Sequence, residues 1–453
     1  MSAKVKDMTS GHPLGLIVAF ALPLMAGSIF QQLYTVVDTM VVGKALGVDA
    51  LAALGATDWL SWMILGMVQG FTQGFGILMA REFGAKKMER LRRVVGASVT
   101  LSALFAAVLL AGAQFMALPM LRLLQTPERV LGNSMLYIRI YFAGIPVIIA
   151  YNLLATVLRS LGDSRTPLTA MVLASLTNIG LDLLFVLVFR WGIVGAAVAT
   201  LIAQVLSSVF CLIRLRKIDF LALQKSDCLL REGLGWRLLG LGWPVALQNG
   251  IIALGGLIIQ RVVNGYGVTM LAGYTATNKL FGLLELAAIS FGYAMLTYAG
   301  QNLGAGDLPR IRKGMTAALG GALGISLIIS AAMLVLGKNI LGLFLSGDPL
   351  EVEQAIRSGY RYLSIMALGL SVLYLLHVVR SAVQGMGDTV LPMVSGIAEF
   401  LMRTGCVLLL PAVLGEDGIY IAEIAAWLGA DLVLIPSYYI TMKKAHRRLG
   451  GSL

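Results

Sequence analysis

The sequence predicts an all-α integral membrane protein whose twelve transmembrane helices form two six-helix bundles, related by a pseudo-twofold axis along the membrane normal. Three observations predict this fold: few charges, long apolar segments, and landmarks that recur between the two halves. Hydrophobic residues make up 58% and charged residues 13% of the 453-residue chain, and its mean hydropathy is +0.85. Soluble domains carry roughly 25% charged residues, so this chain is expected to have a lipid bilayer as its solvent.

Transmembrane spans are expected wherever about 20 mostly apolar residues follow one another. The first apolar run is longer than the core of a signal peptide, about 7–15 residues, and is therefore expected to stay in the membrane as a helix. The first half contains six such segments, 13–42, 51–79, 94–118, 134–158, 166–189 and 192–213. The second half contains six more, 238–263, 270–299, 315–345, 359–384, 389–412 and 418–441.

Lysine and arginine gather in the connections on one side of these spans. By the positive-inside rule that side, with both termini, is expected in the cytoplasm, so the chain is expected to be a multi-pass protein of the plasma (cytoplasmic) membrane. The longest hydrophilic connection, residues 214–237, follows the sixth span and is expected to be a cytoplasmic loop between lobes of residues 1–213 and 238–453. The same count assigns Arg380 to a cytoplasmic loop.

The composition argues against several other classes of protein. The net charge of +12 is explained by the loop cations, so no nucleic-acid partner is expected. The three cysteines form no CxxC pair, which argues against a zinc site or a disulfide framework. The sequence has no Walker A motif, nucleophile elbow or metalloprotease helix, so neither an enzyme nor a covalently bound cofactor is expected. The chain is expected to be a monomer in the lipid bilayer, without an obligatory protein partner.

Landmarks recur between the halves at separations of about 220 residues, which indicates an internal repeat. Leu22-Pro23 matches Trp243-Pro244, Gly84-Ala85 matches Gly304-Ala305, and Gly162-Asp163 with Pro167 matches Gly387-Asp388 with Pro392. Each half has an even number of spans and enters the membrane in the same orientation, so the halves are expected to be parallel repeats. Two lobes that rock about a central cavity suit alternating access, which favours a transporter over a channel.

Polar side chains inside spans are costly in lipid and therefore point to function. Asn178 and Asp182 are four residues apart, so they share one face of the fifth span. A rise of about 1.5 Å per residue places Asp182 and Thr200 at similar depths, near Asp38 in the outer part of the first span. Two carboxylates, an amide and a hydroxyl suit a hard cation, whereas two adjacent carboxyl groups alternatively share one proton. These four residues are therefore predicted to bind the driving ion, either a hard cation or a proton.

The second half carries other ionisable side chains within its spans. Glu399 and Arg403 are four residues apart, which predicts an intrahelical ion pair, with a cavity-lining pair as the alternative. A simple pair would tolerate exchange of its two members. Glu285, whose face also carries Asn278, is a candidate for attracting substrate. His377 is interpreted as a satisfied interior histidine. No role is assigned to the remaining acids, Asp58, Glu423 and Asp431.

Several segments resemble the multidrug and toxic compound extrusion (MATE) family. They are Pro23 with Asp38 fifteen residues later and then Val42-Gly43, the stretch Gln301-Asn302-Leu303-Gly304-Ala305, Gly162-Asp163 through Pro167, and the stretch from Glu399 to Thr404. The resemblance covers nearly the whole chain. It implies two six-helix bundles around a large central cavity, and export of bulky, often cationic organic compounds in exchange for Na⁺ or H⁺.

The resemblance also implies roles for individual residues. In the DNA-damage-inducible (DinF-like) branch the first-lobe cation site falls on Asp38, Asn178, Asp182 and Thr200. Another branch has an acid in its seventh helix, where this chain has Gln248, Asn249 and Ile252, so a second-lobe site of that kind is not expected. Pro23 lacks an amide donor and is predicted to be a hinge. Candidates for lining the cavity for small-molecule substrates are Gln31, Gln32, Gln248, Asn278, Glu285, Glu399 and Arg403.

One alternative function stays open, a lipid-linked precursor flippase of the same superfamily. Such a protein would share the two lobes but would not need the cluster around Asp38 and Asp182. A cavity for anionic headgroups is expected to carry several cations, and the count of lysine and arginine by side leaves only Arg139, Lys279 and Arg403 in the interior of the membrane. The sequence therefore favours a cation-coupled antiporter, and it leaves open both the cargo and the choice between Na⁺ and H⁺.

Overall fold

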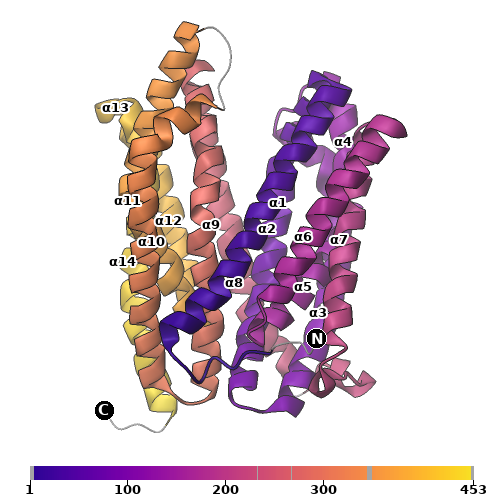
Figure 1. The fold of residues 1–453 in the computed structure, drawn as a ribbon, viewed down its shortest axis with the longest axis vertical. Helices are drawn as coiled ribbons and strands as arrows, with labels where there is room; N and C mark the ends of the chain where they lie inside the picture. The colour runs from indigo at the N-terminus through magenta and orange to yellow at the C-terminus, as the bar shows by residue number, and fades with distance from the viewer. Residues whose placement is uncertain (1–4, 232, 267, 344–348, 450–453) are drawn as a thin grey trace. The chain divides into compact units, whose positions relative to one another are not determined.

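The computed structural model describes residues 5–231, 233–266, 268–343 and 349–449, and every regular element in these ranges is a helix (Figure 1). By length and composition, eleven helices of the described chain can each cross a membrane, and one bent pair supplies a twelfth span. The predicted fold class, an all-α membrane protein with twelve spans, is confirmed. The last two residues of the expected span 315–345 lie outside the described residues.

The helices follow the expected segments closely. The first six spans are α1 (Pro13–Leu46), α2 (Val48–Gly84), α3 (Met88–Leu123), α4 (Glu128–Ala143) with α5 (Ile145–Ser160), α6 (Arg165–Asp182) with the π-helix η1 (Leu183–Val188), and α7 (Ile193–Leu215). The connection 214–237 contains the short 3-10 helices η2 (Asp219–Leu221) and η3 (Lys225–Cys228). The last six spans are α8 (Leu234–Asn264), α9 (Val268–Gly304), α10 (Leu308–Gly342), α11 (Pro349–Gly385), α12 (Val390–Leu409) with α13 (Pro411–Leu414), and α14 (Glu416–Arg448).

The fourth span differs from the single straight helix that the sequence predicts for residues 134–158. The chain bends by 45° between α4 and α5, at Gly144. Pro146 explains the break, because proline has no amide hydrogen and its ring clashes with the preceding turn of a helix. Only Leu410 separates α12 from Pro411, which begins α13, and these two helices together form one span.

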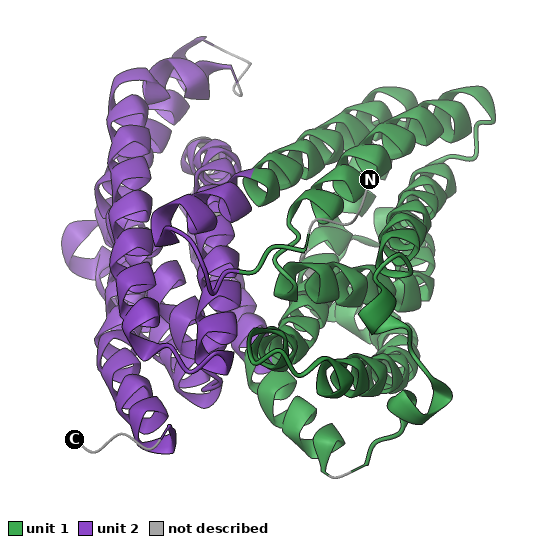
Figure 2. Cartoon of the chain, turned by 60° about the horizontal axis from the view of Figure 1, so that its bottom comes forward, with its two compact units in different colours: residues 1–7, 23–246 green, residues 8–22, 247–453 purple. Residues whose placement is uncertain are grey.

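The chain forms two compact units, residues 1–7 with 23–246 and residues 8–22 with 247–453 (Figure 2). The units therefore divide two helices near an internal proline, α1 beside Pro23 and α8 just after Pro244. The start of α8 packs closely within the first unit, where a Cβ atom on Gly74 would lie 2.4 Å from the Cα atom of Gly242. Small residues permit such close helix crossings in membranes.

The repeat predicted from sequence landmarks is visible in the backbone. Gly162 and Gly387 both have positive φ angles, +80° and +88°, in the turns that precede α6 and α12. After each glycine an aspartate caps the next helix, because Asp163 Oδ1 accepts from the Thr166 amide and Asp388 Oδ1 accepts from the Leu391 amide. The two turns thus share a positive-φ glycine followed by an aspartate that accepts from the next helix.

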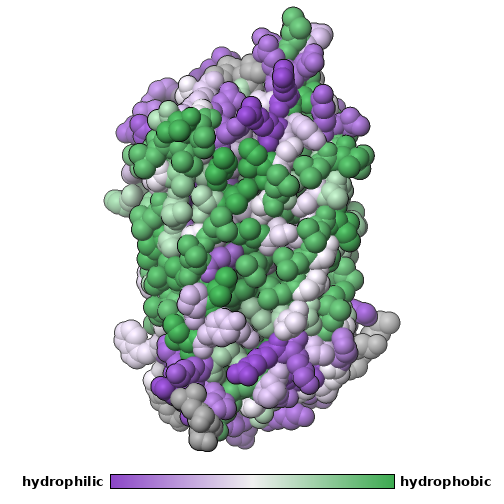
Figure 3. Space-filling view, turned by 90° about the vertical axis from the view of Figure 1, so that its left-hand side faces the viewer, coloured by the Kyte–Doolittle hydropathy of each residue, from purple (hydrophilic) through white to green (hydrophobic). Residues whose placement is uncertain are grey.

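Apolar side chains cover much of the molecular surface. Figure 3 shows one face on which hydrophobic residues occupy the middle and hydrophilic residues gather toward both ends. Side chains such as Val108, Phe115 and Leu432 are 71%, 82% and 75% exposed. A soluble protein would not leave so much contiguous apolar surface in water, and the distribution is the one expected of a protein solvated by lipid.

An even number of spans places both ends of the chain on one side of the membrane. In a variant whose three cysteines are replaced, a cysteine at Ser10 or Arg448 should resist an impermeant thiol reagent in intact cells and react after permeabilisation. A cysteine at Arg190 should be labelled in intact cells and serves as the control. Labelling of one terminus but not the other would contradict the twelve-span topology, and labelling of both from outside would contradict the orientation.

Candidate functional site

Two carboxyl groups meet inside the first unit, Asp38 from α1 and Asp182 at the end of α6. The two carboxyl groups lie close enough to interact with each other. Asp182 is 0% exposed, and neither of its carboxyl oxygens receives a hydrogen bond from the described residues. The same holds for Oδ1 of Asp38. Two neighbouring carboxylates repel each other, so a positive charge, either a proton or a cation, would stabilise this arrangement.

Asn178 and Thr200 form a second pair beside these acids. Asn178 lies four residues before Asp182 on the same face of α6 and is 1% exposed. Its Nδ2 donates to Thr200 Oγ1 at 3.4 Å, and the Thr200 hydroxyl donates to the Ala196 carbonyl at 3.1 Å. Asn178 Oδ1 receives no hydrogen bond from the described residues. Four oxygen-bearing side chains, three of them with uncommitted acceptors, are thus gathered at the α1, α6 and α7 faces of one unit.

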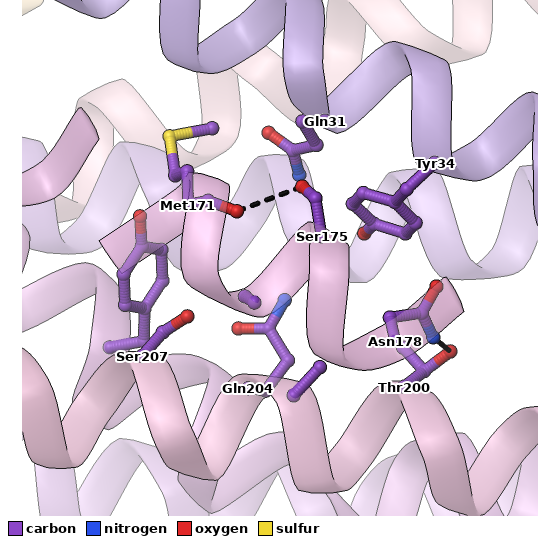
Figure 4. Close-up of a pocket in the computed structure, with 11 residues that line it drawn as sticks. Gln31, Tyr34, Met171, Ser175, Asn178, Thr200, Gln204 and Ser207 are labelled. Atoms are coloured by element: carbon purple, nitrogen blue, oxygen red, sulfur yellow. Dashed lines mark hydrogen bonds between the residues drawn. The ribbon is translucent and has the colours of Figure 1, made fainter. Parts of the chain in front are cut away.

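A pocket opens beside Asn178 and Thr200 (Figure 4). Its walls come from α1, α5, α6 and α7, all within the first unit. The lining residues are Gln31, Tyr34, Tyr151, Met171, Ala174, Ser175, Asn178, Thr200, Ala203, Gln204 and Ser207. Polar side chains therefore continue from the Asn178–Thr200 pair along the pocket, whereas Asp38 and Asp182 are not part of its wall.

The helix that carries Asp182 changes its geometry directly after that residue. The π-helix η1 begins at Leu183, and its hydrogen bonds join residues five positions apart, as in Phe189 N to Leu184 O at 2.9 Å. The ring of Phe185 stacks on Phe189 and on Trp191, with centroids 5.9 Å and 4.7 Å apart. Short π-helices inside α-helices are rare and occur often at functional sites.

In the second unit, buried charges form a continuous chain across three helices. Glu399 of α12 accepts from Arg380 Nη2 of α11 at 2.7 Å and from Arg403 Nη2 at 3.0 Å. Arg403 also donates to Glu423 of α14 at 3.0 Å. Glu399, Arg403 and Arg380 are only 3%, 5% and 9% exposed. Each charge of this chain, Arg380–Glu399–Arg403–Glu423, therefore has an opposite partner, which offsets part of its desolvation.

Other polar residues of the second unit are engaged with neighbours. His377 Nε2 lies 3.3 Å from Glu285 Oε1, so the partner of Glu285 is this histidine, which sequence analysis did not pair with it. Asn278 Oδ1 accepts from the Tyr362 hydroxyl at 3.1 Å. Gln248 is 1% exposed and joins two helices, because its amide donates to the Pro392 carbonyl at 2.8 Å and its oxygen accepts from Gln384.

Comparison with known proteins accounts for both the fold and the repeat. The profile of the MatE family matches the chain twice, at residues 23–184 and 244–406. The chain belongs to the MatE family. The two matches begin at Pro23 and Pro244, the landmarks from which the repeat was inferred. As a member of this family of multidrug efflux MATE transporters, it is a multi-pass membrane protein, and its relatives are transporters rather than enzymes.

Two relatives and one solved structure show how far the likeness to other MATE proteins extends. The chain is 31% identical to the probable multidrug resistance protein YpnP of Bacillus subtilis (strain 168), over 92% of each chain. It is 30% identical to the probable multidrug resistance protein YoeA of the same organism, over 72% of each. A solved structure described as the outward-facing conformation of a multidrug resistance MATE family transporter of the MOP superfamily matches with a TM-score of 0.90 and 22% identity, covering 99% of this chain and 100% of that one.

Sequence analysis missed two members of the charge chain of this MATE transporter. Glu423 had no assigned role, and Arg380 was placed in a cytoplasmic loop, which is wrong. Arg380 lies inside α11, which continues to Gly385, and it is buried. The signal for both residues was their position in apolar segments, since a charge there needs a partner on a neighbouring helix. The predicted Glu399–Arg403 pair exists, but it is the middle of a longer chain.

A simple ion pair would tolerate exchange of Glu399 and Arg403. Because Arg380 and Glu423 also bind these residues, we expect the exchange to destabilise the protein. The double substitution Glu399→Arg with Arg403→Glu would place a second arginine against Arg380 and a second glutamate against Glu423. We expect it to destabilise the protein more than Glu399→Gln alone, for which removal of one partner costs about 3–5 kcal/mol. Thermal unfolding of the purified proteins in detergent measures both.

An exposed pair provides the control for this exchange. Arg129 and Asp49 are 79% and 46% exposed at their side chains and lie 2.9 Å apart. Exchanging these two residues should change the free energy of unfolding by less than about 1 kcal/mol. A Glu399–Arg403 exchange that leaves the protein as stable as the wild type would show that Arg380 and Glu423 contribute nothing to the chain.

Proposed function

We propose that this MATE transporter is a cation-coupled antiporter, driven by Na⁺ or H⁺, that exports bulky organic and often cationic compounds by alternating access. The observation that carries the proposal is the pair formed by the half-buried Asp38 and the buried Asp182. Both oxygens of Asp182 and Oδ1 of Asp38 lack donors, and no arginine or lysine neutralises the pair among the contacts of the described residues. Such a pair is stable only when it holds a mobile positive charge. An ion that enters and leaves this site supplies the coupling.

Either coupling ion suits the chemistry of the four residues. For Na⁺, the ligands would be the carboxylates of Asp38 and Asp182, Asn178 Oδ1 and Thr200 Oγ1, because hard cations prefer oxygen. For H⁺, one proton shared between the two carboxyl groups removes their repulsion. The four residues correspond to the first-lobe set that the DinF-like resemblance implies, and we propose that the chain belongs to that branch.

Coupling requires that the ion favour one conformation over another. Pro23 is suited to be the hinge, because it interrupts the amide ladder of the helix that carries Asp38 and stands where the first-unit part of α1 begins. Neutralising Asp38 would then change how α1 packs on α6. We further propose that the transporter works as a monomer in the plasma membrane with both termini in the cytoplasm.

Cargo contacts are proposed for polar residues that are only partly buried. Gln31 lines the first-unit pocket, Gln32 is its neighbour on α1, and Glu285 with Asn278 presents an acid to a cationic cargo. Gln248, Glu399 and Arg403 are held by other side chains of the second unit, so their contribution would be to position helices. The matching relatives carry multidrug-resistance names, which favours drug export over transport of a lipid-linked precursor.

The proposal is tested by ethidium efflux from membrane vesicles under separately imposed Na⁺ and pH gradients. Asp38→Asn removes the charge and permits no proton cycle, so gradient-driven efflux should fall to background. Asp182→Asn should be equally severe, and Thr200→Ala milder, because it deletes one neutral ligand. The gradient that drives the wild type identifies the ion.

Asp49→Asn is the matched control, since Asp49 lies at the start of α2 in an exposed ion pair and its removal should leave efflux near the wild-type rate. All variants must keep the wild-type elution in size-exclusion chromatography. Concentrative efflux by Asp38→Asn at the wild-type rate would exclude this site as the coupling site.

A further inference from the structure

Asp431 is a buried acid that the charge chain of the second unit does not include. It lies on α14 and is 4% exposed, and neither carboxyl oxygen has a hydrogen-bond partner among the described residues. Glu399 and Glu423, by contrast, each bind an arginine. A buried carboxylate without a partner is far more costly than a buried carboxylic acid.

The helices packed against α14 supply one charged group of each sign near Asp431. These groups are Arg380 from α11 and Glu399 from α12. The third helix, α10, carries its charges at its two ends, as Arg310, Arg312, Lys313 and Lys338, and α13 carries none. A further helix, α9, packs on α14 through Phe281 and Trp427, and it carries Lys279 and Glu285. Glu285 lies 3.3 Å from His377 of α11. Arg380 is therefore the cation positioned to neutralise a negative charge on Asp431.

Arg380 has hydrogen-bonding capacity left for this role. Its Nη2 donates to Glu399 Oε2 at 2.7 Å and lies 3.5 Å from Ser395 Oγ, whereas its Nε is buried and has no acceptor in the described part of the chain. One unsatisfied donor and two unsatisfied acceptor atoms thus lie in the same interior region of the second unit. A guanidinium presents its donors as a fork, so it can bind two carboxylates at different edges.

The four charges of the buried series Arg380–Glu399–Arg403–Glu423 already balance one another. Arg380 and Arg403 offset Glu399 and Glu423, so an ionised Asp431 would add a fifth charge without a counterpart. In the conformation described here, with Arg380 Nε unpaired, a proton on Asp431 removes that charge. Ionisation of Asp431 would instead draw the Nε–H of Arg380 toward it and weaken the bond between Arg380 and Glu399.

We propose that Asp431 is a proton-binding site of the second unit and that Arg380 is a counter-ion shared between it and Glu399. Asp431 carries its proton while Arg380 binds Glu399 alone, and it releases the proton to solvent when Arg380 also turns toward α14. The proton therefore controls how α11 is tied to α12 and α14. This site is separate from the Asp38–Asp182 pair. The proposal for Asp431 is the same whether the first unit binds Na⁺ or H⁺.

Infrared difference spectroscopy of the purified full-length protein tests the protonation directly. The spectrum of wild type minus Asp431→Asn should show the carbonyl band of a protonated carboxyl group at neutral pH, and raising the pH should remove it. The matched control is Asp417→Asn on the same helix, because Asp417 is paired with Arg361. Its difference spectrum should show a carboxylate band instead. Absence of the protonated band from the Asp431 spectrum would overturn the proposal.

Two further variants test the shared counter-ion and keep the proposal falsifiable if Asp431→Asn does not fold. Arg380→Gln removes the cation, so the wild-type carboxyl band assigned to Asp431 should persist to a pH higher by about 1–3 units. Glu399→Gln frees Arg380 for Asp431, so the band should vanish at lower pH. In both variants the remaining members of the chain keep a partner, Glu399 with Arg403 or Arg403 with Glu423. Shifts in the same direction, or no shift, would show that Arg380 is not shared.

Discussion

A charge in the hydrocarbon region must be neutralised nearby, and this requirement organises the polar interior of both units. The second unit meets it with fixed charges, since two arginines and two glutamates alternate along one chain. In the described part of the first unit, Asp38 and Asp182 have no arginine or lysine partner. Two acids that need a bound ion for neutralisation are suited to exchange that ion with solvent. Acids with permanent arginine partners are suited to hold helices in fixed positions.

The repeat makes this contrast sharper, because corresponding positions carry the two solutions. Counted from the matching aspartates Asp163 and Asp388, the same step along the helix reaches Asn178 in one repeat and Arg403 in the other. Counted from the positive-φ glycines 192 and 415, the same step reaches Thr200 and Glu423. Asn178 and Thr200 form a neutral hydrogen bond, whereas Arg403 and Glu423 form an ion pair. One backbone arrangement therefore serves a site with free acceptors in one unit and a closed ion pair in the other.

Features of the fold that depend on local pattern could be predicted from the sequence. Span lengths follow from apolar runs, and the repeat follows from glycine, aspartate and proline in turns whose geometry demands them. The break at Pro146 was missed because the flanking residues are apolar enough to continue one helix. The partners Arg380 and Glu423 were missed because a pairing between helices depends on their relative rotation, which periodicity does not supply. The same limit hid the proximity of His377 to Glu285, whereas helical spacing alone was enough to group Asn178 with Asp182.

The π-helix after Asp182 makes the length of this segment as significant as its composition. An α-helix turns by about 100° per residue, so the wider winding of Leu183–Val188 accommodates chain that a regular helix would not. Loss of one residue between Asp182 and Gly192 would either convert η1 to α-helix or rotate Asp182 away from Asp38. Insertions and deletions, usually tolerated at the end of a span, are therefore constrained here by the angular position of a single carboxyl group.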